Sequence, residues 1–179
     1  MNKWVNPLEP IIYTPDAIDR DLKRIVGRSY FEDPIIYPLF ETLYNTGCRA
    51  GEVLDLSRWK IAEGGAVVLS PQKGNDKRIM NQEVIGDQFL AMIKGEAPFP
   101  TAINYDRLRY QFKALSLYHH MYVGDKKASL HLFRHNFVKK LLASGHDEEE
   151  IQEILGERNI KSVKSYTESK FTNRAIKEY

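Results

Sequence analysis

The chain has 179 residues, of which 42% are hydrophobic and 28% charged, a composition that fits one globular domain with a sizeable core. No apolar run approaches the roughly 20 residues that a membrane helix needs, and the amino end has no apolar signal segment, so we expect neither a membrane partner nor secretion. The single cysteine, Cys48, excludes an internal disulfide and favours a cytoplasmic location.

The net charge of +2 is the sum of two very different segments. Between residues 105 and 140 there are eight basic and two acidic side chains, a net of +6, whereas residues 147–153 hold five acidic side chains and no basic one. A segregated basic face can follow a phosphate backbone even when the whole chain is almost neutral. The same pattern also fits ordinary solvated helix faces, so charge alone does not identify a partner.

The first helix is expected near residues 15–26. Thr14 can cap its amino end, and Pro15 suits the first helical position because it has no backbone N–H to leave unpaired. Gly27 is the expected stop. The residues before this helix, 1–13, are expected to form a linker-like segment.

A second helix and a short third one are expected to follow. Asp33 and Pro34 repeat the start signal, and apolar side chains continue with helical spacing as far as Gly47. The segment AGEVLDL then predicts a short helix with Arg49 at or just before its amino end. Backbone N–H groups at such an end favour an anion, so Arg49 is a candidate phosphate ligand.

The pattern changes after Trp59 to short β-prone runs separated by glycine-containing turns, which predicts a small three-stranded antiparallel sheet. Beyond it, helices are expected near 86–94, 104–119, 130–143, 148–155 and 160–167, with a polar tail over 168–179. The expected fold class is therefore mostly α with a small three-stranded antiparallel β-sheet (α+β), in a single domain that spans residues 1–179.

The segment HLFRH contains the most informative side chains. On a helix, the 100° step per residue puts His131, Arg134 and His135 on one stripe and apolar side chains on another. The two histidines could be structural, or they could share a zinc ion, since they stand four residues apart. Arg134 between them argues against a cation and suits a phosphate. The further histidines that a metal could use are His119, His120 and His146.

Together these segments resemble the catalytic domain of the tyrosine recombinases, also called phage integrases, from about Thr14 to Tyr166. The family motif T-G-x-R-x-x-E is matched by Thr46, Gly47, Arg49 and Glu52. The family box H-x-x-R-H is matched by His131, Arg134 and His135. The lysine that the family places in a β-hairpin turn is matched best by Lys73 and next by Lys77. Each motif is short, but their order and joint spacing are hard to obtain by chance.

The last family motifs are an L-G-H or L-G-W box and a tyrosine nine residues beyond it. Here the box is Leu155, Gly156 and Glu157, and Tyr166 stands nine residues after Glu157. A carboxylate cannot donate a hydrogen bond, and about 4 Å from a phosphate it would cost on the order of 4 kcal/mol at an effective dielectric constant of about 20. We therefore expect Glu157 to turn away and pair with a base such as Arg158. A protonated Glu157 or a weakened enzyme are the alternatives.

The resemblance implies a reversible transesterification that uses no cofactor and no metal. Tyr166 would attack the scissile phosphate and form a 3′-phosphotyrosyl link. Arg49 and Arg134 would stabilise the charge that develops on phosphorus. His131 would bind a phosphate oxygen or help to move the tyrosine proton, and Lys73 would protonate the departing 5′ oxygen. The residues that would orient these groups are Glu52 and His135.

The resemblance also implies the partners, which are double-stranded DNA and other protomers assembled on it, with the tail 168–179 docking onto a neighbour. The implied function is site-specific recombination or integration, in the cytoplasm of a prokaryote or of the host of a mobile element. A DNA-binding regulator that has lost cleavage is the alternative, which Glu157 favours, and a type IB topoisomerase is a more remote one. The family's amino-terminal DNA-clamping (core-binding) domain is expected to be absent, since about a dozen residues precede the first helix.

Overall fold

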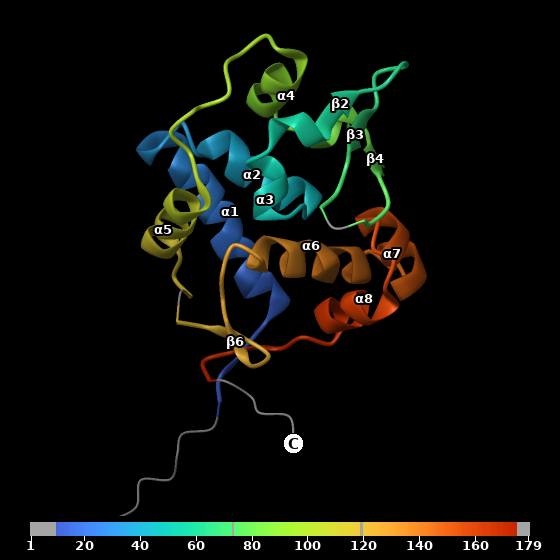
Figure 1. The fold of residues 1–179 in the computed structure, drawn as a ribbon. Coiled ribbons are helices and arrows are strands. Elements are labelled where there is room, and N and C mark those ends of the chain that lie inside the picture. Colours follow the sequence, from blue (N-terminus) through green and yellow to red (C-terminus); the bar gives the residue numbers. More distant parts are fainter. Residues whose placement is uncertain (1–9, 73, 119, 175–179) are drawn as a thin grey trace, which may run out of the picture.

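The computed structural model describes residues 10–72, 74–118 and 120–174. Within these ranges, helices make up the middle of the molecule and two small antiparallel sheets lie at its edges (Figure 1). The predicted fold class, mostly helical with a small antiparallel sheet, is confirmed, and the structure adds a second small sheet that was not predicted. None of the described helices is long and apolar enough to cross a membrane.

The helices follow the predicted order closely. They are α1 (Pro15–Glu32), α2 (Tyr37–Thr46), α3 (Ala50–Val53), α4 (Asp87–Lys94), α5 (Tyr105–Leu115), α6 (Leu132–Ala143), α7 (Glu148–Leu155) and α8 (Ile160–Thr167), with short 3-10 helices at Leu56–Arg58 and Gln82–Val84. The strands are β1 (Ile12–Tyr13), β2 (Trp59–Ile61), β3 (Val67–Leu69), β4 (Arg78–Met80), β5 (Tyr122–Val123), β6 (Lys126–Lys127) and β7 (Phe171–Thr172).

Helix α1 is longer than its sequence signals predicted. Thr14 caps it as expected, because its hydroxyl accepts a hydrogen bond from a backbone N–H three residues on. The helix nevertheless runs through Gly27, so the predicted stop there was wrong. A glycine inside a helix costs only about 1 kcal/mol relative to alanine. The fully buried side chains that pack this helix against its neighbours, and that outweigh this cost, are Ile18, Leu22 and Ile25.

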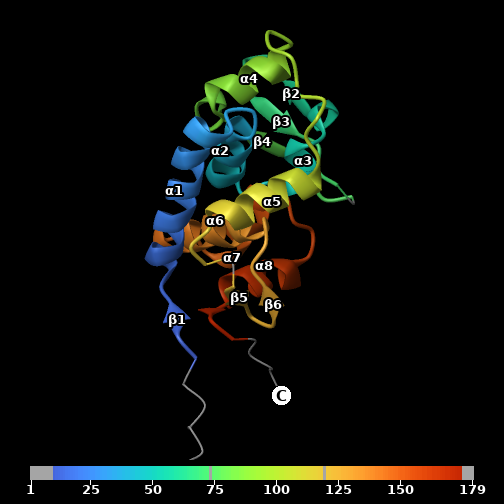
Figure 2. The ribbon, with the colours of Figure 1, turned by 90° about the vertical axis from the view of Figure 1, so that its left-hand side faces the viewer.

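The predicted three-stranded sheet is present as β2, β3 and β4 in antiparallel order, with Lys60 opposite Val68 and Val68 opposite Ile79. The second sheet has the order β1-β7-β5-β6, and its strands are two residues long. In it Thr172 lies opposite both Ile12 and Tyr122. The segment expected to be the start of a polar tail is therefore a buried inner strand, close to α8 (Figure 2).

Helix α6 lies between the two apolar clusters of the core. Phe133 belongs to the larger cluster and stacks near the rings of Phe40 and Phe112. Val138 belongs to the smaller cluster, which joins α6 to α7 and α8 and also contains Tyr166. Figure 1 shows this arrangement, with α6 crossing the middle of the molecule above α8. The HLFRH segment at the start of α6 is thereby placed where the two clusters meet.

Candidate active site

Arg49 is positioned by a tight turn at the end of α2. Gly47 ends that helix with a left-handed backbone (φ 60°), and a Cβ at this position would lie 2.5 Å from the ring of Phe137. Only glycine fits both the conformation and the space. The turn delivers Arg49 to the position that precedes α3, as the sequence predicted.

Glu52 holds Arg49 in place from the first turn of α3. Its buried carboxylate accepts a hydrogen bond from the Arg49 backbone N–H (2.6 Å) and lies 3.4 Å from Nη1 of the Arg49 side chain. The indole of Trp59 donates to the backbone carbonyl of Glu52 (2.7 Å). This arrangement orients the guanidinium group, which is the role expected for Glu52.

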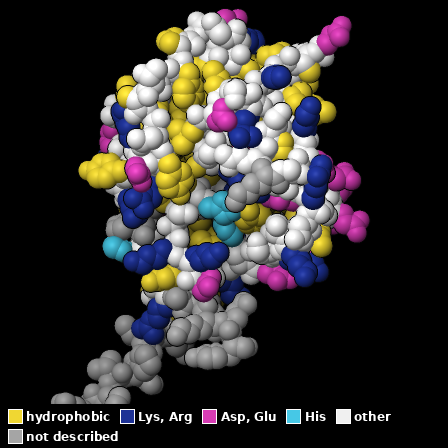
Figure 3. Space-filling model, viewed as in Figure 1, with side chains coloured by type: hydrophobic (Ala, Val, Ile, Leu, Met, Phe, Trp, Pro, Cys, Tyr) yellow, Lys and Arg dark blue, Asp and Glu magenta, His cyan; other side chains and the backbone are white. Residues whose placement is uncertain are grey.

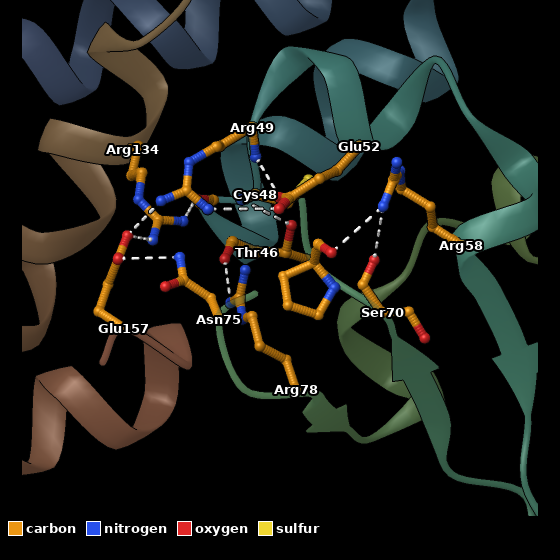
Figure 4. Close-up of polar contacts among 12 residues, drawn as sticks. Thr46, Cys48, Arg49, Glu52, Arg58, Ser70, Asn75, Arg78, Arg134 and Glu157 are labelled. Atoms are coloured by element: carbon orange, nitrogen blue, oxygen red, sulfur yellow. Dashed lines mark hydrogen bonds and ion pairs between the residues drawn. The ribbon is translucent and has the colours of Figure 1, made fainter. Parts of the chain in front are cut away.

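The two arginines converge on a single carboxylate oxygen. Arg134, which is only 1% exposed, donates from Nη1 to the carbonyl of Gly47 (2.8 Å) and from Nη2 to Oε1 of Glu157 (2.5 Å). Arg49 donates from its own Nη2 to the same oxygen of Glu157. Figure 4 shows the guanidinium groups of the two arginines close to this carboxylate, each coming from a different segment of the chain. The structure thus brings together the two arginines that the sequence analysis singled out, and we call this pair the clamp.

The position of Glu157 corrects the sequence prediction. Glu157 does not turn away, because it lies inside the clamp, where its second oxygen accepts from the Asn75 amide (3.0 Å). Arg158 pairs instead with Asp76 on the surface (2.9 Å). The prediction considered only the repulsion between Glu157 and a phosphate. The buried guanidinium group of Arg134, with the half-buried one of Arg49 beside it, also needs an anion close by, and Glu157 supplies it.

The connection between α7 and α8 points Glu157 inward. Gly156 ends α7 with a left-handed backbone (φ 64°), and a Cβ there would collide with the carbonyl oxygen of Asp76. The Asp76 N–H donates to the Gly156 carbonyl (2.9 Å), which fastens this turn to the turn before β4. Glu157 is consequently only 5% exposed.

Arg78 is a buried positioning residue that the sequence analysis missed. From β4 it donates to the carbonyls of Ile154 (2.9 Å) and Thr46 (2.5 Å), so it links the end of α7 to the turn that carries Arg49. Burial lowers the pKa of Arg78 to about 10. Arg78 lies opposite Leu69, a buried residue of the neighbouring strand. A charged side chain that faces the core needs dedicated partners, and its place in a predicted strand was the feature that could have indicated this role.

Tyr166 and His131 form the other half of the site. The Tyr166 hydroxyl lies 2.8 Å from Nε2 of His131, and the Tyr166 ring centroid is 5.4 Å from the guanidinium carbon of Arg134. Burial, together with the positive charges of Arg134 and Arg49, lowers the pKa of His131 to about 4. The imidazole is therefore neutral near pH 7, and a neutral imidazole has one ring nitrogen that can accept the phenol proton.

His135 supports this pair from one turn further along α6. Its ring packs edge-on against Tyr166, with centroids 4.8 Å apart, and its Nδ1 lies 3.1 Å from the hydroxyl of Ser169. Burial, followed by the nearby charge of His131, lowers the pKa of His135 to about 3. The ring contact and the hydrogen bond fit an orienting role.

Two further predictions concerned a lysine of the active site and a possible metal site. Lys73 lies outside the described residues, and Lys77 lines a separate pocket beside Phe137 and Glu153. His119 also lies outside them. Among the residues that the structure describes, no three His, Cys, Asp or Glu side chains gather as a metal site would require.

A basic groove opens beside the tyrosine. Its volume is about 1010 Å³, and it lies between the β5–β6 hairpin and α8, with His131, His135 and Tyr166 in its wall. The lysines that line it are Lys126, Lys127, Lys161, Lys164 and Lys170. Figure 3 shows the corresponding face, where histidine side chains are visible near the centre and lysines and arginines surround them.

Comparison with known proteins shows the family of the chain. The model of the phage integrase family matches residues 33–173, which is most of the chain. The chain therefore belongs to the phage integrase family. The resemblance inferred from the motifs is thereby confirmed at the level of the family.

Two curated relatives match the chain over part of their own length. Tyrosine recombinase XerD of Rhizobium meliloti (strain 1021) is 28% identical over 82% of this chain and 54% of that protein. Tyrosine recombinase XerC of Pelobacter propionicus is 28% identical over 72% of this chain and 46% of that protein. The chain thus spans about half the length of these curated relatives.

Two solved structures show the fold. XerA recombinase superposes with a TM-score of 0.60 at 20% identity, over 93% of this chain and 61% of that one. XerH site-specific recombinase, bound to a palindromic difH substrate in a post-cleavage complex, gives a TM-score of 0.58 at 18% identity, over 93% and 52% of the two chains. At these identities the likeness concerns the fold alone.

Proposed function

We propose that this chain is the catalytic domain of a site-specific DNA recombinase that cleaves and rejoins DNA through a covalent 3′-phosphotyrosyl intermediate. The observation that carries the proposal is the convergence of Arg49 and Arg134 on one oxygen position, with the Tyr166–His131 pair beside it. Two guanidinium groups and a nearby phenol are the groups that phosphoryl transfer to tyrosine requires.

In the proposed reaction, the scissile phosphate binds where the two arginines meet. The Tyr166 oxygen forms a bond to phosphorus while its proton passes to Nε2 of His131, and the bond from phosphorus to the 5′ oxygen breaks. Lys73 is proposed to protonate the departing 5′ oxygen. The phosphotyrosyl ester retains the energy of the broken ester, so the reverse attack by a 5′ hydroxyl rejoins a strand. Losing either arginine should cost about 10² to 10³ in rate.

The test uses a library of nicked duplexes with a randomised central segment, because the recognised DNA sequence is unknown. A nick close to the cleavage point lets the short leaving strand diffuse away and traps the covalent product. The expected result is a protein–DNA complex that survives denaturation in the parent and is lost in Tyr166→Phe. A complex that persists in Tyr166→Phe, or that also forms on another tyrosine, would contradict the assignment of the nucleophile.

A DNA-binding regulator that no longer cleaves is the second candidate, and the carboxylate of Glu157 inside the clamp favours it. A regulator would shift the mobility of the same duplexes through its basic groove and form no covalent product. That result, repeated in a Glu157→His variant, would decide for the regulator.

Recombination, as opposed to cleavage of one strand, requires further protomers on the same DNA. We propose double-stranded DNA and such protomers as partners, and the cytoplasm as the place of action because the substrate is DNA. Strand exchange between two duplexes that carry the recovered sequence is the readout that separates recombination from simple cleavage.

A further inference from the structure

Glu157 stands where the proposed reaction needs a phosphate. Nη2 of Arg49 and Nη2 of Arg134 both donate to one oxygen of this carboxylate, and the side chain is 3% exposed. A phosphate oxygen that bonds both arginines would have to occupy the same point. The carboxylate and the phosphate therefore exclude each other by volume as well as by charge.

We propose that Glu157 is an internal occupant of the clamp, a latch that keeps the arginines closed until a phosphate displaces it. This inference rests on the proposed function, because it assumes that the clamp formed by Arg49 and Arg134 binds phosphate. It goes beyond that function in assigning a regulatory role to the residue at which this chain departs from the family's L-G-H or L-G-W box.

The exchange is electrostatically balanced. Replacing one monovalent carboxylate by one monovalent phosphodiester leaves the net charge around the two arginines unchanged. The guanidinium group of Arg134, which is buried, and that of Arg49, which is half-buried, then have an anionic partner before and after the exchange, and the released carboxylate can be hydrated. A neutral side chain at position 157 would lack this property, because it removes the carboxylate that pairs with Arg134.

The turn before β4, with Asn75 and Asp76, holds Glu157 in the clamp and lies close to the surface. Asn75 donates to the other oxygen of Glu157, and the Asp76 N–H holds the Gly156 carbonyl next to it. The carboxylate of Asp76 pairs with Arg158, where both side chains are well exposed. The turn before β4 thus contacts residues 156–158 at three points, and DNA that moves this turn would loosen Glu157.

The first experiment measures phosphate binding without any DNA. Thermal unfolding of the parent, Glu157→Gln and Glu153→Gln is followed in inorganic phosphate and in chloride of equal ionic strength. Glu153→Gln is the matched control, since it makes the same exchange at an exposed position of α7. Only Glu157→Gln should be stabilised by phosphate, by about 3 to 5 °C for each tenfold rise in phosphate above its dissociation constant. Equal responses of all three proteins would overturn the latch.

A Glu52→Gln variant separates occupation of the clamp from loss of nearby charge. Glu52 also contacts Arg49, but it has its own place in the first turn of α3 and does not lie between the two arginines. The latch predicts a phosphate response in Glu157→Gln that is absent from Glu52→Gln. The same response in both would mean that any missing carboxylate near Arg49 suffices, and the latch would be rejected.

The second experiment measures formation of the Tyr166-dependent covalent complex on the nicked duplexes. Glu157→Gln and Glu157→His should form it at least about tenfold faster than the parent, because the population of open clamps is higher. If phosphate stabilises Glu157→Gln but no protein forms a covalent complex, the latch stands and the proposed function fails. If the parent forms the complex and neither variant is faster or binds phosphate, the latch fails and the function stands.

A variant that unfolds would also be informative. Folding of Glu157→Gln in phosphate but not in chloride would support the latch, because an external anion would then replace the missing carboxylate. If Glu157→Gln stays unfolded in both, Glu157→His is measured in its place, and a Glu157→His protein that binds phosphate no better than the parent overturns the proposal.

Discussion

The arginine half and the tyrosine half of the site are built in different ways. Arg134 and Arg78 are almost fully buried, and each donates to backbone carbonyls of other segments, so the clamp is fixed by hydrogen bonds from several elements. Tyr166 sits on α8 in the smaller apolar cluster, and its hydroxyl has His131 as partner. The comparison indicates that Arg134 is held by hydrogen bonds from several elements, whereas the position of the nucleophile depends on a small core.

The largest expected effect is that of breaking the clamp. Arg134→Ala leaves the buried Glu157 carboxylate with one guanidinium partner fewer and opens a gap in the core, which should lower the free energy of unfolding by about 3 to 5 kcal/mol. Urea denaturation measures it. Arg134→Lys retains the charge but cannot bond both Gly47 and Glu157 in the same way, so it should recover only part of the loss. An Arg134→Ala protein as stable as the parent would contradict a clamp held by this residue.

The turn that delivers Arg49 gives the next effect. Gly47→Ala places a Cβ 2.5 Å from the Phe137 ring in addition to straining the backbone, and it should cost about 1 to 3 kcal/mol. Gly64→Ala is the matched control, since Gly64 also has a positive φ (88°) but an added Cβ would meet nothing within 4 Å. The difference in unfolding free energy between the two variants isolates the collision with Phe137, and no difference would mean that the ring moves aside freely.

The tyrosine half should be the more sensitive to pH. His131 and His135 have pKa values of about 4 and 3 in the folded protein, below the ordinary value of 6.5. At pH values between about 4 and 6.5 the unfolded chain therefore binds more protons than the folded protein does. The free energy of unfolding falls as the pH drops through this window. Unfolding measured over this window should show the loss, and it should be smaller in His135→Gln. A stability that stays flat from pH 7 to 4.5 would contradict two neutral, buried histidines.

The smallest effect is expected where His135 meets α8. Ser169→Ala removes the hydroxyl 3.1 Å from Nδ1 of His135 and should cost about 0.5 to 1.5 kcal/mol. Ser165→Ala is the control, because the Ser165 hydroxyl bonds to a carbonyl of its own helix and is exposed. Equal stabilities of these two variants would show that the contact with His135 contributes nothing measurable.

Much of this could be predicted from the sequence, and the exceptions have physical reasons. The helices at Arg49, Arg134 and Tyr166 could be predicted from their capping residues and the spacing of their apolar side chains. The order of the motifs predicted that these three residues meet. The second sheet could not be predicted, because strands of two residues show no periodicity and β7 depends on pairing with Ile12 and Tyr122. The partners of Glu157 were predicted wrongly because the choice followed closeness in sequence. Arg158 is the adjacent base, but it pairs with Asp76, whereas Glu157 pairs with Arg49 and Arg134.

Strand β7 has one more consequence, which concerns the path of the chain. Because Thr172 pairs with Ile12, the first and last described segments are neighbours, and the last one follows shortly after the helix that carries Tyr166. The first and last described residues of the chain are thus close together in space. Joining residues 10 and 174 by a linker and opening the chain in the turn at Gly64 and Gly65 would give a circular permutant that keeps the pairing of Ile12 with Thr172.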